Sequence, residues 1–340
     1  MIDINKKRLE EILDRIRGKR IAVLGDLMLD RYFWGSVSRI SPEAPVPVVD
    51  MESEQTRLGG AANVAMNIRS LGGEPFLIGV VGDDSSGKRL RDILTESKFP
   101  SGGIVTDPSR PTTVKTRIIA HGQHVVRIDR ESRNDIAPDI QERILKVLQE
   151  NIASIDGIII EDYNKGVVVK SLITQTIDFL RKSKKIIAVD PKFNNFFEYR
   201  NVSIFKPNRK EAEEALGTKL RSEEDVLGAG KEILNRLHVE HVLLTRGEMG
   251  MSLFESSGNV FHTPTKARNV ADVSGAGDTV IATLTLAMAG GATVREAATL
   301  ANYAGGVVCG YVGIVPIQRD ELLAAVLNDG LSSDSKDRKS

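Results

Sequence analysis

The stretch GIIIEDYNKGVVVKSLITQTIDFLRKSKKIIAV, residues 157–189, decides the fold of this chain. It opens on an apolar run at 157–160, continues with a helical pattern at 171–182, and closes on a second apolar run at 185–189. Both apolar runs are continuous rather than alternating, which is typical of strands covered on both faces. A strand, a helix and a strand in this order predict a parallel pair joined by a crossover helix.

The same alternation runs through most of the chain. Further apolar runs occupy residues 20–24, 75–81, 202–205 and 241–245, and further helical patterns occupy residues 61–71, 138–153, 209–216 and 223–237. Strands and helices that alternate along a chain form an α/β fold, in which helices flank a mainly parallel sheet. We therefore predict a large α/β unit.

Two segments break this pattern and read as antiparallel strands. Residues 46–52 begin at the end of the proline-containing stretch SPEAPVP at 41–47. Residues 113–129 are divided by the turn sequence HGQ at 121–123. Prolines and glycines of this kind mark strand ends and tight turns. We predict a small β lid, from about residues 31–58 and 104–130, over one end of the large sheet. An extra sheet edge with no part in closure is the alternative.

Composition restricts the class of protein. The chain has 340 residues, with 46 lysines and arginines against 46 aspartates and glutamates, so its formal net charge is zero. No overall charge attracts nucleic acid or anionic lipid, and small molecules are the expected partners. The single cysteine, Cys309, excludes an intrachain disulfide and a cysteine-cluster zinc site, and it fits a reducing compartment.

The sequence shows neither the pattern of a signal peptide nor an apolar run long enough to cross a membrane. Residues 1–10 are charged within a few positions, and the longest apolar run, residues 280–289, is far shorter than the roughly 20 residues that cross a bilayer. We therefore expect a cytoplasmic protein without membrane contact. The polar stretch LSSDSKDRKS at 331–340 predicts a disordered tail from about residue 329.

The segment DVSGAGDT at 272–279 carries the clearest chemical signal. It runs directly into the apolar stretch 280–289, so its small residues lie where a buried helix begins. The backbone N–H groups of Gly275, Ala276 and Gly277 can converge there on an anion, which the helix dipole also attracts. Asp278 would repel that anion unless it removes a proton from a hydroxyl that attacks a phosphate. A glycine-rich helix entry, with Asp278 as a dipole partner, is the structural alternative.

A second cluster of small residues, GGAAN at 59–63, opens the helix predicted at 61–71. Glycine pairs let a ligand approach the backbone, and the Asn63 amide can bond to hydroxyls. Asp26 adds a carboxylate at the end of the first strand, the edge at which open α/β sheets bind ligands. Together, Asp26, Gly59, Gly60 and Asn63 indicate a site for a polyol.

Two further segments follow predicted strands. KPNRKE at 206–211 places Asn208 and Glu211 on one face of a helix, although an Asn and a Glu at this spacing also form an ordinary helix cap. TRGEMG at 245–250 has small residues that can admit an adenine or a ribose, and a β-turn explains them nearly as well. Neither segment is decisive by spacing alone.

With these motifs the chain resembles the ribokinase-like sugar kinases, the PfkB family, over nearly its whole length. Residues 59–63 are similar to the family's N-terminal signature, and residues 272–279 resemble its D-x-x-G-A-G-D signature. Residues 208–211 are similar to its N-x-x-E motif, which implies that Asn208 and Glu211 serve Mg²⁺ and the nucleotide phosphates. Residues 245–250 resemble the nucleotide-binding loop of the family, and residues 300–304 are similar to the family's segment near the adenine site. The implied nucleotide-binding residues are Asn208, Glu211, Thr245, Gly247, Gly250 and Asn302.

The resemblance implies a ribokinase-like three-layer α/β/α domain over residues 1–328, with a mainly parallel sheet and a small β lid. It also implies an ATP-dependent carbohydrate kinase with ATP and Mg²⁺ as cofactors. Asp278 would be the base of such a kinase, with the backbone of residues 275–277 around the transferred phosphoryl group.

Within the family, RISPEAPVPV at 39–48 looks like the lid segment of kinases that phosphorylate D-glycero-β-D-manno-heptose 7-phosphate, a step toward ADP-heptose and lipopolysaccharide. The implied reaction transfers the ATP γ-phosphoryl group to the anomeric hydroxyl and gives the 1,7-bisphosphate. Cations must hold the 7-phosphate, and the candidates are Lys115, Arg117, Lys165 and Lys192. The alternatives are a kinase for another sugar phosphate or a nucleoside, and a non-catalytic sugar-binding regulator on the same fold.

Many such kinases continue into a cytidylyltransferase-like domain with an H-x-G-H motif, which this sequence does not contain. We therefore expect a stand-alone kinase whose product passes to a separate nucleotidyltransferase. The exposed sheet edge of the predicted lid favours a homodimer that pairs lid on lid.

Overall fold

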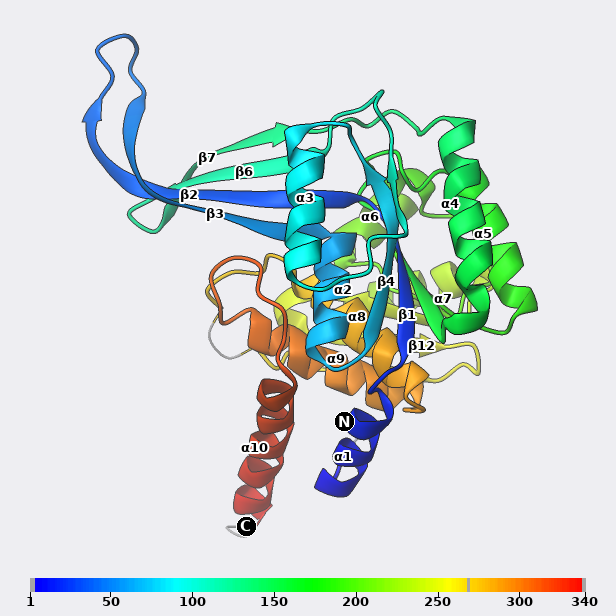
Figure 1. Cartoon of the computed structure of the whole chain (residues 1–340). Helices are drawn as coiled ribbons and strands as arrows, with labels where there is room; N and C mark the ends of the chain where they lie inside the picture. The colour runs from blue at the N-terminus through cyan, green and yellow to red at the C-terminus, as the bar shows by residue number, and fades with distance from the viewer. Residues whose placement is uncertain (1–3, 268–269, 338–340) are drawn as a thin grey trace.

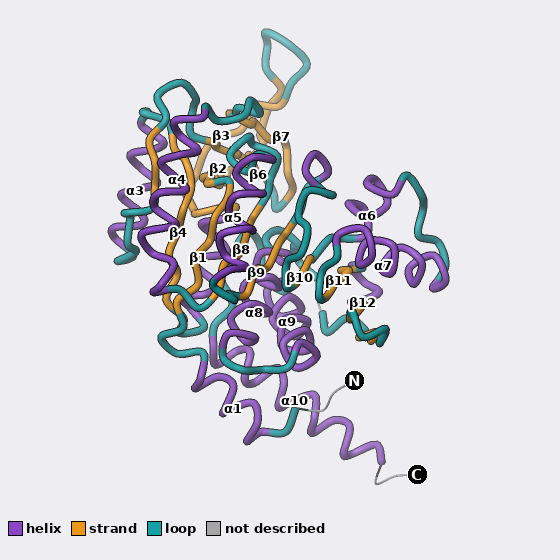
Figure 2. Tube along the Cα trace, turned by 90° about the vertical axis from the view of Figure 1, so that its right-hand side faces the viewer, coloured by secondary structure: helices purple, strands orange, loops and turns teal. Residues whose placement is uncertain are grey.

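The computed structural model of the chain describes residues 4–267 and 270–337. The strands of the larger sheet are β1 (Arg20–Gly25), β4 (Glu74–Val81), β5 (Ile104–Thr106), β8 (Gly157–Glu161), β9 (Ile186–Asp190), β10 (Ile204–Phe205), β11 (His241–Thr245), β12 (Met251–Glu255) and β13 (Val260–Thr263). Their order is β13-β12-β11-β10-β9-β8-β1-β4-β5, and Figure 2 shows the strands from β4 to β12 in this order. The pairs from β11 to β5 are parallel, and β12 and β13 are antiparallel. The predicted mainly parallel sheet is confirmed.

Helices cover both faces of this sheet and give three layers (Figure 2). One layer contains α1 (Lys6–Arg15), α2 (Ala61–Ser70), α3 (Ser85–Glu96), α8 (Ala276–Ala289), α9 (Val294–Val308) and α10 (Arg319–Asp337); the other contains α4 (Pro138–Asn151), α5 (Lys170–Lys182), α6 (Arg209–Leu216) and α7 (Glu223–Leu237). Short 3-10 turns occupy Ile152–Ser154, Phe193–Asn195 and Gly247–Met249. Across the described ranges, no helix combines the length and the apolar character that a membrane span requires.

The side chains of β1 show why its sequence is continuously apolar. Ile21 and Val23 pack with the layer that contains α8, whereas Ala22 and Leu24 pack with the layer that contains α4 and α5. Successive side chains of a strand point to opposite faces, so a strand between two helical layers needs an apolar residue at every position. The same burial explains the other short apolar runs of the sequence.

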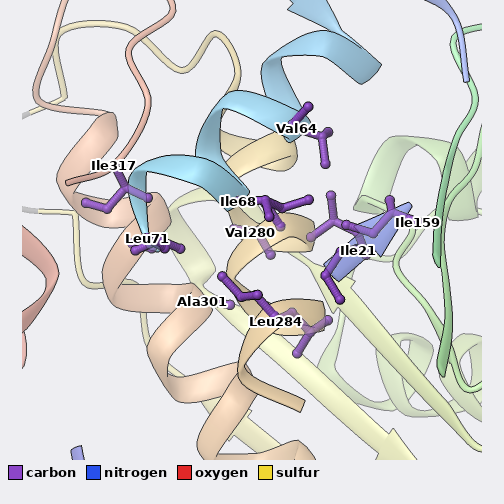
Figure 3. Close-up of a cluster of buried hydrophobic side chains, with 14 of the residues drawn as sticks. Ile21, Val64, Ile68, Leu71, Ile159, Val280, Leu284, Ala301 and Ile317 are labelled. Carbon is purple, nitrogen blue, oxygen red and sulfur yellow. The ribbon is translucent and has the colours of Figure 1, made fainter. Parts of the chain in front are cut away.

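Helix α8 lies at the centre of one layer, and its residues 278–287 are all buried. Figure 3 shows Val280 and Leu284 of this helix beside Ile21 and Ile68, with Ala301 of α9 close to them. A helix that is buried all round is fixed by packing on every side. Its first turn, where the predicted base lies, therefore has a fixed position relative to the large sheet.

A separate sheet forms the predicted lid and projects from one side of the molecule (Figure 1). Its strands are β2 (Leu27–Ile40), β3 (Pro47–Gly60), β6 (Thr113–Ala120) and β7 (Gln123–Arg130), in the order β3-β2-β6-β7. The second lid segment begins at Thr113 and not at residue 104 as predicted. Residues 104–106 form β5, which pairs with β4 in the larger sheet because Ile104 and Val105 are buried in the main core.

The C-terminal segment differs from the predicted disordered tail. Helix α10 continues through Asp337, and residues 338–340 lie outside the described residues. The Asp329 carboxylate accepts a hydrogen bond from Tyr303 Oη at 2.8 Å and pairs with Lys266. These contacts hold α10 against α9 beyond residue 328, and the polar composition of the segment gave no sign of them.

Candidate active site

Small residues build the beginning of α8, as the sequence predicts. Gly275 has a φ of +76°, and a Cβ at this position would lie 2.9 Å from Asn63 Nδ2. Glycine adopts this backbone conformation without strain and leaves room for the neighbouring side chain. The helix starts at Ala276, so Asp278 falls in its first turn, where N–H groups lack helical partners and attract anions.

The Asp278 carboxylate is 3% exposed and is held from two sides. Asn63 Nδ2 donates to its Oδ2 at 2.7 Å, and Tyr163 Oη donates to its Oδ1 at 2.7 Å. Burial raises the pKa of Asp278 to about 6, although both hydrogen bonds favour the charged form and act in the opposite direction. This arrangement produces a carboxylate that can accept a proton near neutral pH.

Two more buried carboxylates lie beside Asp278. Oxygen atoms of Glu161, Asp190 and Asp278 all lie within 4.8 Å of one another. Burial and the neighbouring carboxylates raise the pKa of Glu161 well above its usual range, and within the described structure its Oε2 makes no hydrogen bond. Lys206 Nζ lies 2.7 Å from Asp190 Oδ2 and balances part of this charge. Three carboxylates with an unpartnered oxygen fit a hard divalent cation such as Mg²⁺.

Asn208 and Glu211, the residues predicted to serve Mg²⁺, form the helix cap that was the structural alternative. Asn208 Oδ1 accepts the Glu211 N–H at 2.9 Å, and Glu211 Oε2 accepts the Asn208 N–H at 2.8 Å. Glu211 also pairs with Lys192. The cap is confirmed, and a magnesium role for these two residues stays a prediction, with water as the link to the ion.

A cavity of about 1180 Å³ lies beside the first turn of α8. Its walls include the predicted nucleotide residues Asn208, Thr245, Gly247, Gly250 and Asn302, together with residues 275–278. Basic side chains also line it, namely Lys192, Lys206, Arg209, Lys210, Lys219, Arg221 and Arg246. A helix N-terminus and positive side chains around one cavity suit a polyphosphate.

The glycine pair predicted to bind a polyol ends β3 beside a carboxylate that the sequence analysis did not single out. A Cβ on Gly59 would lie 1.9 Å from Asp30 Oδ2, and a Cβ on Gly60 would lie 2.5 Å from the Asp26 carbonyl oxygen. Asp30 is buried in β2 and pairs with Arg117 of β6. Gly59 therefore makes space for Asp30, which adds a carboxylate to the predicted polyol side, and Gly60 makes space for the backbone of Asp26.

Asp26 has a structural task that its position at the end of β1 did not reveal. Its carboxylate is 1% exposed and accepts the backbone N–H groups of Tyr163, Lys165 and Val167 at 2.7, 3.2 and 3.3 Å. Burial and the nearby Asp162 raise the pKa of Asp26 to about 6. Asp26 thus fixes the loop that follows β8, and its predicted contact with the sugar stays untested.

The four cationic side chains predicted to hold a sugar phosphate lie in two different parts of the structure. Lys165 Nζ lies 2.8 Å from Glu131 Oε2, and Lys115 Nζ lies 3.5 Å from the same oxygen. Arg117 lies on the same lid strand as Lys115. Lys192 instead pairs with Glu211 and lines the cavity beside α8, so the structure separates it from the other three.

Comparison with known proteins shows the family of this chain. A model of the pfkB family carbohydrate kinases matches residues 19–319. The chain belongs to this pfkB family. The bifunctional protein HldE of Geobacter sulfurreducens is 43% identical over 323 residues, which cover 95% of this chain and 66% of that protein. HldE of Pelobacter propionicus is 42% identical over 333 residues, which cover 98% of this chain and 68% of that protein.

Solved structures of other sugar kinases share the fold of this pfkB kinase. Phosphofructokinase-2 from Escherichia coli, in complex with potassium, has a TM-score of 0.75 and 19% identity over 92% of this chain and 99% of its own. Ribokinase from Arabidopsis thaliana, complexed with ribose and ATP, has a TM-score of 0.72 and 20% identity over 91% and 99%. The predicted ribokinase-like three-layer fold is confirmed.

The pfkB kinase site contains residues that the sequence analysis passed over, namely Asp30, Glu161, Tyr163, Asp190 and Lys206. Glu161 and Asp190 are the last residues of the parallel strands β8 and β9. The argument that placed Asp26 at a ligand-binding sheet edge applies equally to both. The contact between Tyr163 and Asp278 joins residues 115 positions apart, and no local pattern of the sequence reports it.

The structural task of Asp26 is testable by Asp26→Ala. Three buried N–H groups would lose their acceptor, at about 1–3 kcal/mol each, so the free energy of unfolding should fall by about 2 kcal/mol or more. Equilibrium urea unfolding at pH 8 measures the change, with Asp178→Ala on the exposed face of α5 as the control. An unchanged stability with a raised KM for the sugar would show that Asp26 serves the sugar alone.

Proposed function

We propose that this chain transfers the γ-phosphoryl group of ATP, with Mg²⁺, to the anomeric hydroxyl of D-glycero-β-D-manno-heptose 7-phosphate, which gives the 1,7-bisphosphate. The observation that carries the proposal is the buried Asp278 carboxylate in the first turn of α8, at the wall of the large cavity. The resemblance of residues 39–48 to the lid of heptose 7-phosphate kinases supports this substrate. The 40–43% identity to bifunctional HldE proteins also supports it.

In this proposal Asp278 is the base. The anomeric hydroxyl gives its proton to the carboxylate while its oxygen bonds to the γ-phosphorus, and ADP leaves. With a pKa of about 6, most of the Asp278 carboxylate is ionised and ready for the proton at neutral pH. The N–H groups of residues 275–277 stabilise the negative charge on the phosphoryl group in transfer.

The cavity beside α8 is proposed to take ATP. Thr245, Gly247, Gly250 and Asn302 would surround the base and ribose, and its basic side chains would face the phosphates. Asn208 and Glu211 would hold Mg²⁺ through water, and the carboxylates of Glu161 and Asp190 would be direct ligands. Bound Mg²⁺ supplies positive charge that neutralises the polyphosphate.

The sugar phosphate is proposed to lie at the base of the lid, near Lys115, Arg117 and Lys165. Two of these cations, Lys115 and Lys165, already pair with the Glu131 carboxylate, whereas Arg117 pairs with Asp30. Burial acts against its charge, yet the neighbouring Lys165, Arg133 and Lys115 lower the pKa of Glu131 to about 2. A site that holds one carboxylate so strongly in its charged form can hold a phosphate in its place.

Replacement of Lys165 tests the substrate assignment. Lys165→Ala should raise the KM for heptose 7-phosphate by about tenfold or more and leave the unphosphorylated heptose unaffected, because the lost contact exists only with the phosphate. Phosphoryl transfer is measured with a panel of phosphorylated and unphosphorylated sugars, and the exposed Lys146→Ala is the control.

Equal turnover of phosphorylated and unphosphorylated sugars by the native chain would contradict a phosphate site. Preference for another sugar phosphate in the panel would favour the second candidate, a pfkB kinase for a different sugar. A non-catalytic sugar-binding regulator has less support, because a sensor has no use for a base at the position of Asp278.

Asp278→Asn tests the base. The amide cannot accept the proton, so kcat should fall by about 100-fold or more, the usual scale for a positioned base. The fold and the affinity for ATP should stay near those of the native chain, because the amide has the same shape. Steady-state kinetics and nucleotide titration measure both, and near-native turnover would remove Asp278 from the mechanism.

The lid is also proposed to pair with the lid of a second copy. Strand β7 forms one edge of the lid sheet and is exposed along its whole length. Val126 and Ile128 share one face of this strand and are 46% and 56% exposed. An apolar face at an unpaired sheet edge suits a symmetric partner. The homodimer is proposed to work in the cytoplasm, and its product is proposed to pass to a nucleotidyltransferase.

Charged substitutions on this face test the dimer. The double variant Val126→Lys with Ile128→Lys should be a monomer at concentrations where the native chain is a dimer, because four lysines would meet across a symmetric interface. Light scattering after size exclusion gives the mass. Val312→Lys, at an exposed valine outside the lid, is the control and should stay dimeric. A monomeric native chain would overturn the proposal.

A further inference from the structure

Tyr163 connects the loop after β8 to the proposed base. Its Oη donates to Asp278 Oδ1 at 2.7 Å, and its backbone N–H donates to Asp26 Oδ2 at 2.7 Å. The Lys192 ammonium lies 5.2 Å from the centre of its ring. The phenol is therefore held at the hydroxyl, at the backbone and at the face of the ring.

The phenol remains a hydrogen-bond donor in this position. Its Oη lies 2.7 Å from Asp278 Oδ1, and an ionised carboxylate oxygen can only accept, so the phenol supplies the proton of this bond. A hydroxyl that donates to one carboxylate oxygen orients the carboxylate and leaves its remaining lone pairs for the proton that it must accept.

Two donors fix the rotation of the Asp278 carboxyl group. Asn63 bonds to one oxygen and Tyr163 to the other, so the plane of the carboxylate cannot turn without breaking one bond. Each oxygen has two lone pairs, and each is left with one for the attacking hydroxyl. Phosphoryl transfer depends on such alignment, because an error of about 1 Å in position can cost about 100-fold in rate.

We infer that Tyr163 is a positioning residue for the phosphoryl transfer, whose hydroxyl holds the Asp278 carboxylate in the orientation in which it accepts the proton of the sugar. The inference rests on the proposed role of Asp278 and adds a requirement for a residue from another element. Asn63 belongs to α2, and Tyr163 belongs to the loop that Asp26 fixes through three N–H groups. The carboxylate is thereby oriented from both sides by parts of the main scaffold.

A buried tyrosine in the segment between β9 and β10, which bonds to the loop after β8, supplies a matched control. Tyr199 is fully buried, and its Oη donates to Asp162 Oδ2 at 2.6 Å. Asp162 directly precedes Tyr163 in the chain. Tyr199→Phe thus removes the same hydroxyl from a carboxylate of the same loop, and Asp162 is not the proposed base.

The experiment compares Tyr163→Phe with Tyr199→Phe in steady-state kinetics. Tyr163→Phe keeps the ring and removes one oxygen, so kcat should fall by about 10- to 100-fold while the KM for ATP stays within error. The thermal unfolding temperature should fall by a similar amount in both variants, because each takes one hydrogen bond from a buried carboxylate. Tyr199→Phe should keep kcat within about threefold. A kcat within threefold of the native value for Tyr163→Phe, or equal losses in the two variants, would overturn the inference.

A double variant separates positioning from direct contact with the substrate. If Tyr163 acts through Asp278, Tyr163→Phe should change the residual single-turnover rate of Asp278→Asn by less than about twofold. A loss as large as in the native background would show that Tyr163 acts on the substrate itself and would overturn the inference.

The proposed substrate is judged separately, by whether the native chain turns over heptose 7-phosphate. If another sugar phosphate of the panel is the better acceptor, the same variants are compared with that sugar. The ratio of variant to native kcat then still decides the role of Tyr163.

Discussion

Three carboxylates buried in one place constrain the rest of this site. The oxygens of Glu161, Asp190 and Asp278 lie within 4.8 Å of one another. Two unit charges at this separation repel by about 3.5 kcal/mol at an effective dielectric constant of about 20, so the cluster needs cations beside it. Lys206, itself buried, bonds to Asp190, and Lys192 lies near the same group. A nucleotide that arrives with Mg²⁺ brings further positive charge to this place.

Two parts of the fold, helix α8 and the loop after β8, fix the position and orientation of the proposed base, Asp278. Helix α8 is buried all round, and its packing sets the position of Asp278 along the sheet edge. Asp26 accepts hydrogen bonds from backbone N–H groups of the loop after β8 and so fixes this loop. In the same loop, Tyr163 contacts the proposed base and Lys165 pairs with Glu131 beside the lid. One short loop thus contacts both the reacting end of the site and the place proposed for the sugar phosphate. This explains why a carboxylate is buried at Asp26, which faces backbone N–H groups.

The sequence predicts the larger sheet well, because a strand that is buried on both faces needs an apolar residue at every position and so appears in the sequence as a continuous apolar run. It also predicts the beginning of α8, since residues 275–277 must be small for the backbone to approach an anion. Contacts between distant elements leave no such trace. The hydrogen bond from Tyr163 to Asp278, the pair of Arg117 and Asp30, and the bonds of Asp329 to α9 all required the folded chain. Two hydrogen bonds of the folded chain show that the ambiguous motif at 208–211 forms a helix cap.

The central claim is that this site places a phosphoryl group on the anomeric oxygen of a heptose that already carries a 7-phosphate. The most direct test is phosphorus NMR of the product formed from ATP and D-glycero-β-D-manno-heptose 7-phosphate. The account predicts a new phosphate resonance coupled to the anomeric proton, with the 7-phosphate resonance retained and ADP formed in equal amount. A new phosphate on any other carbon, or ADP without a new sugar phosphate, would contradict it.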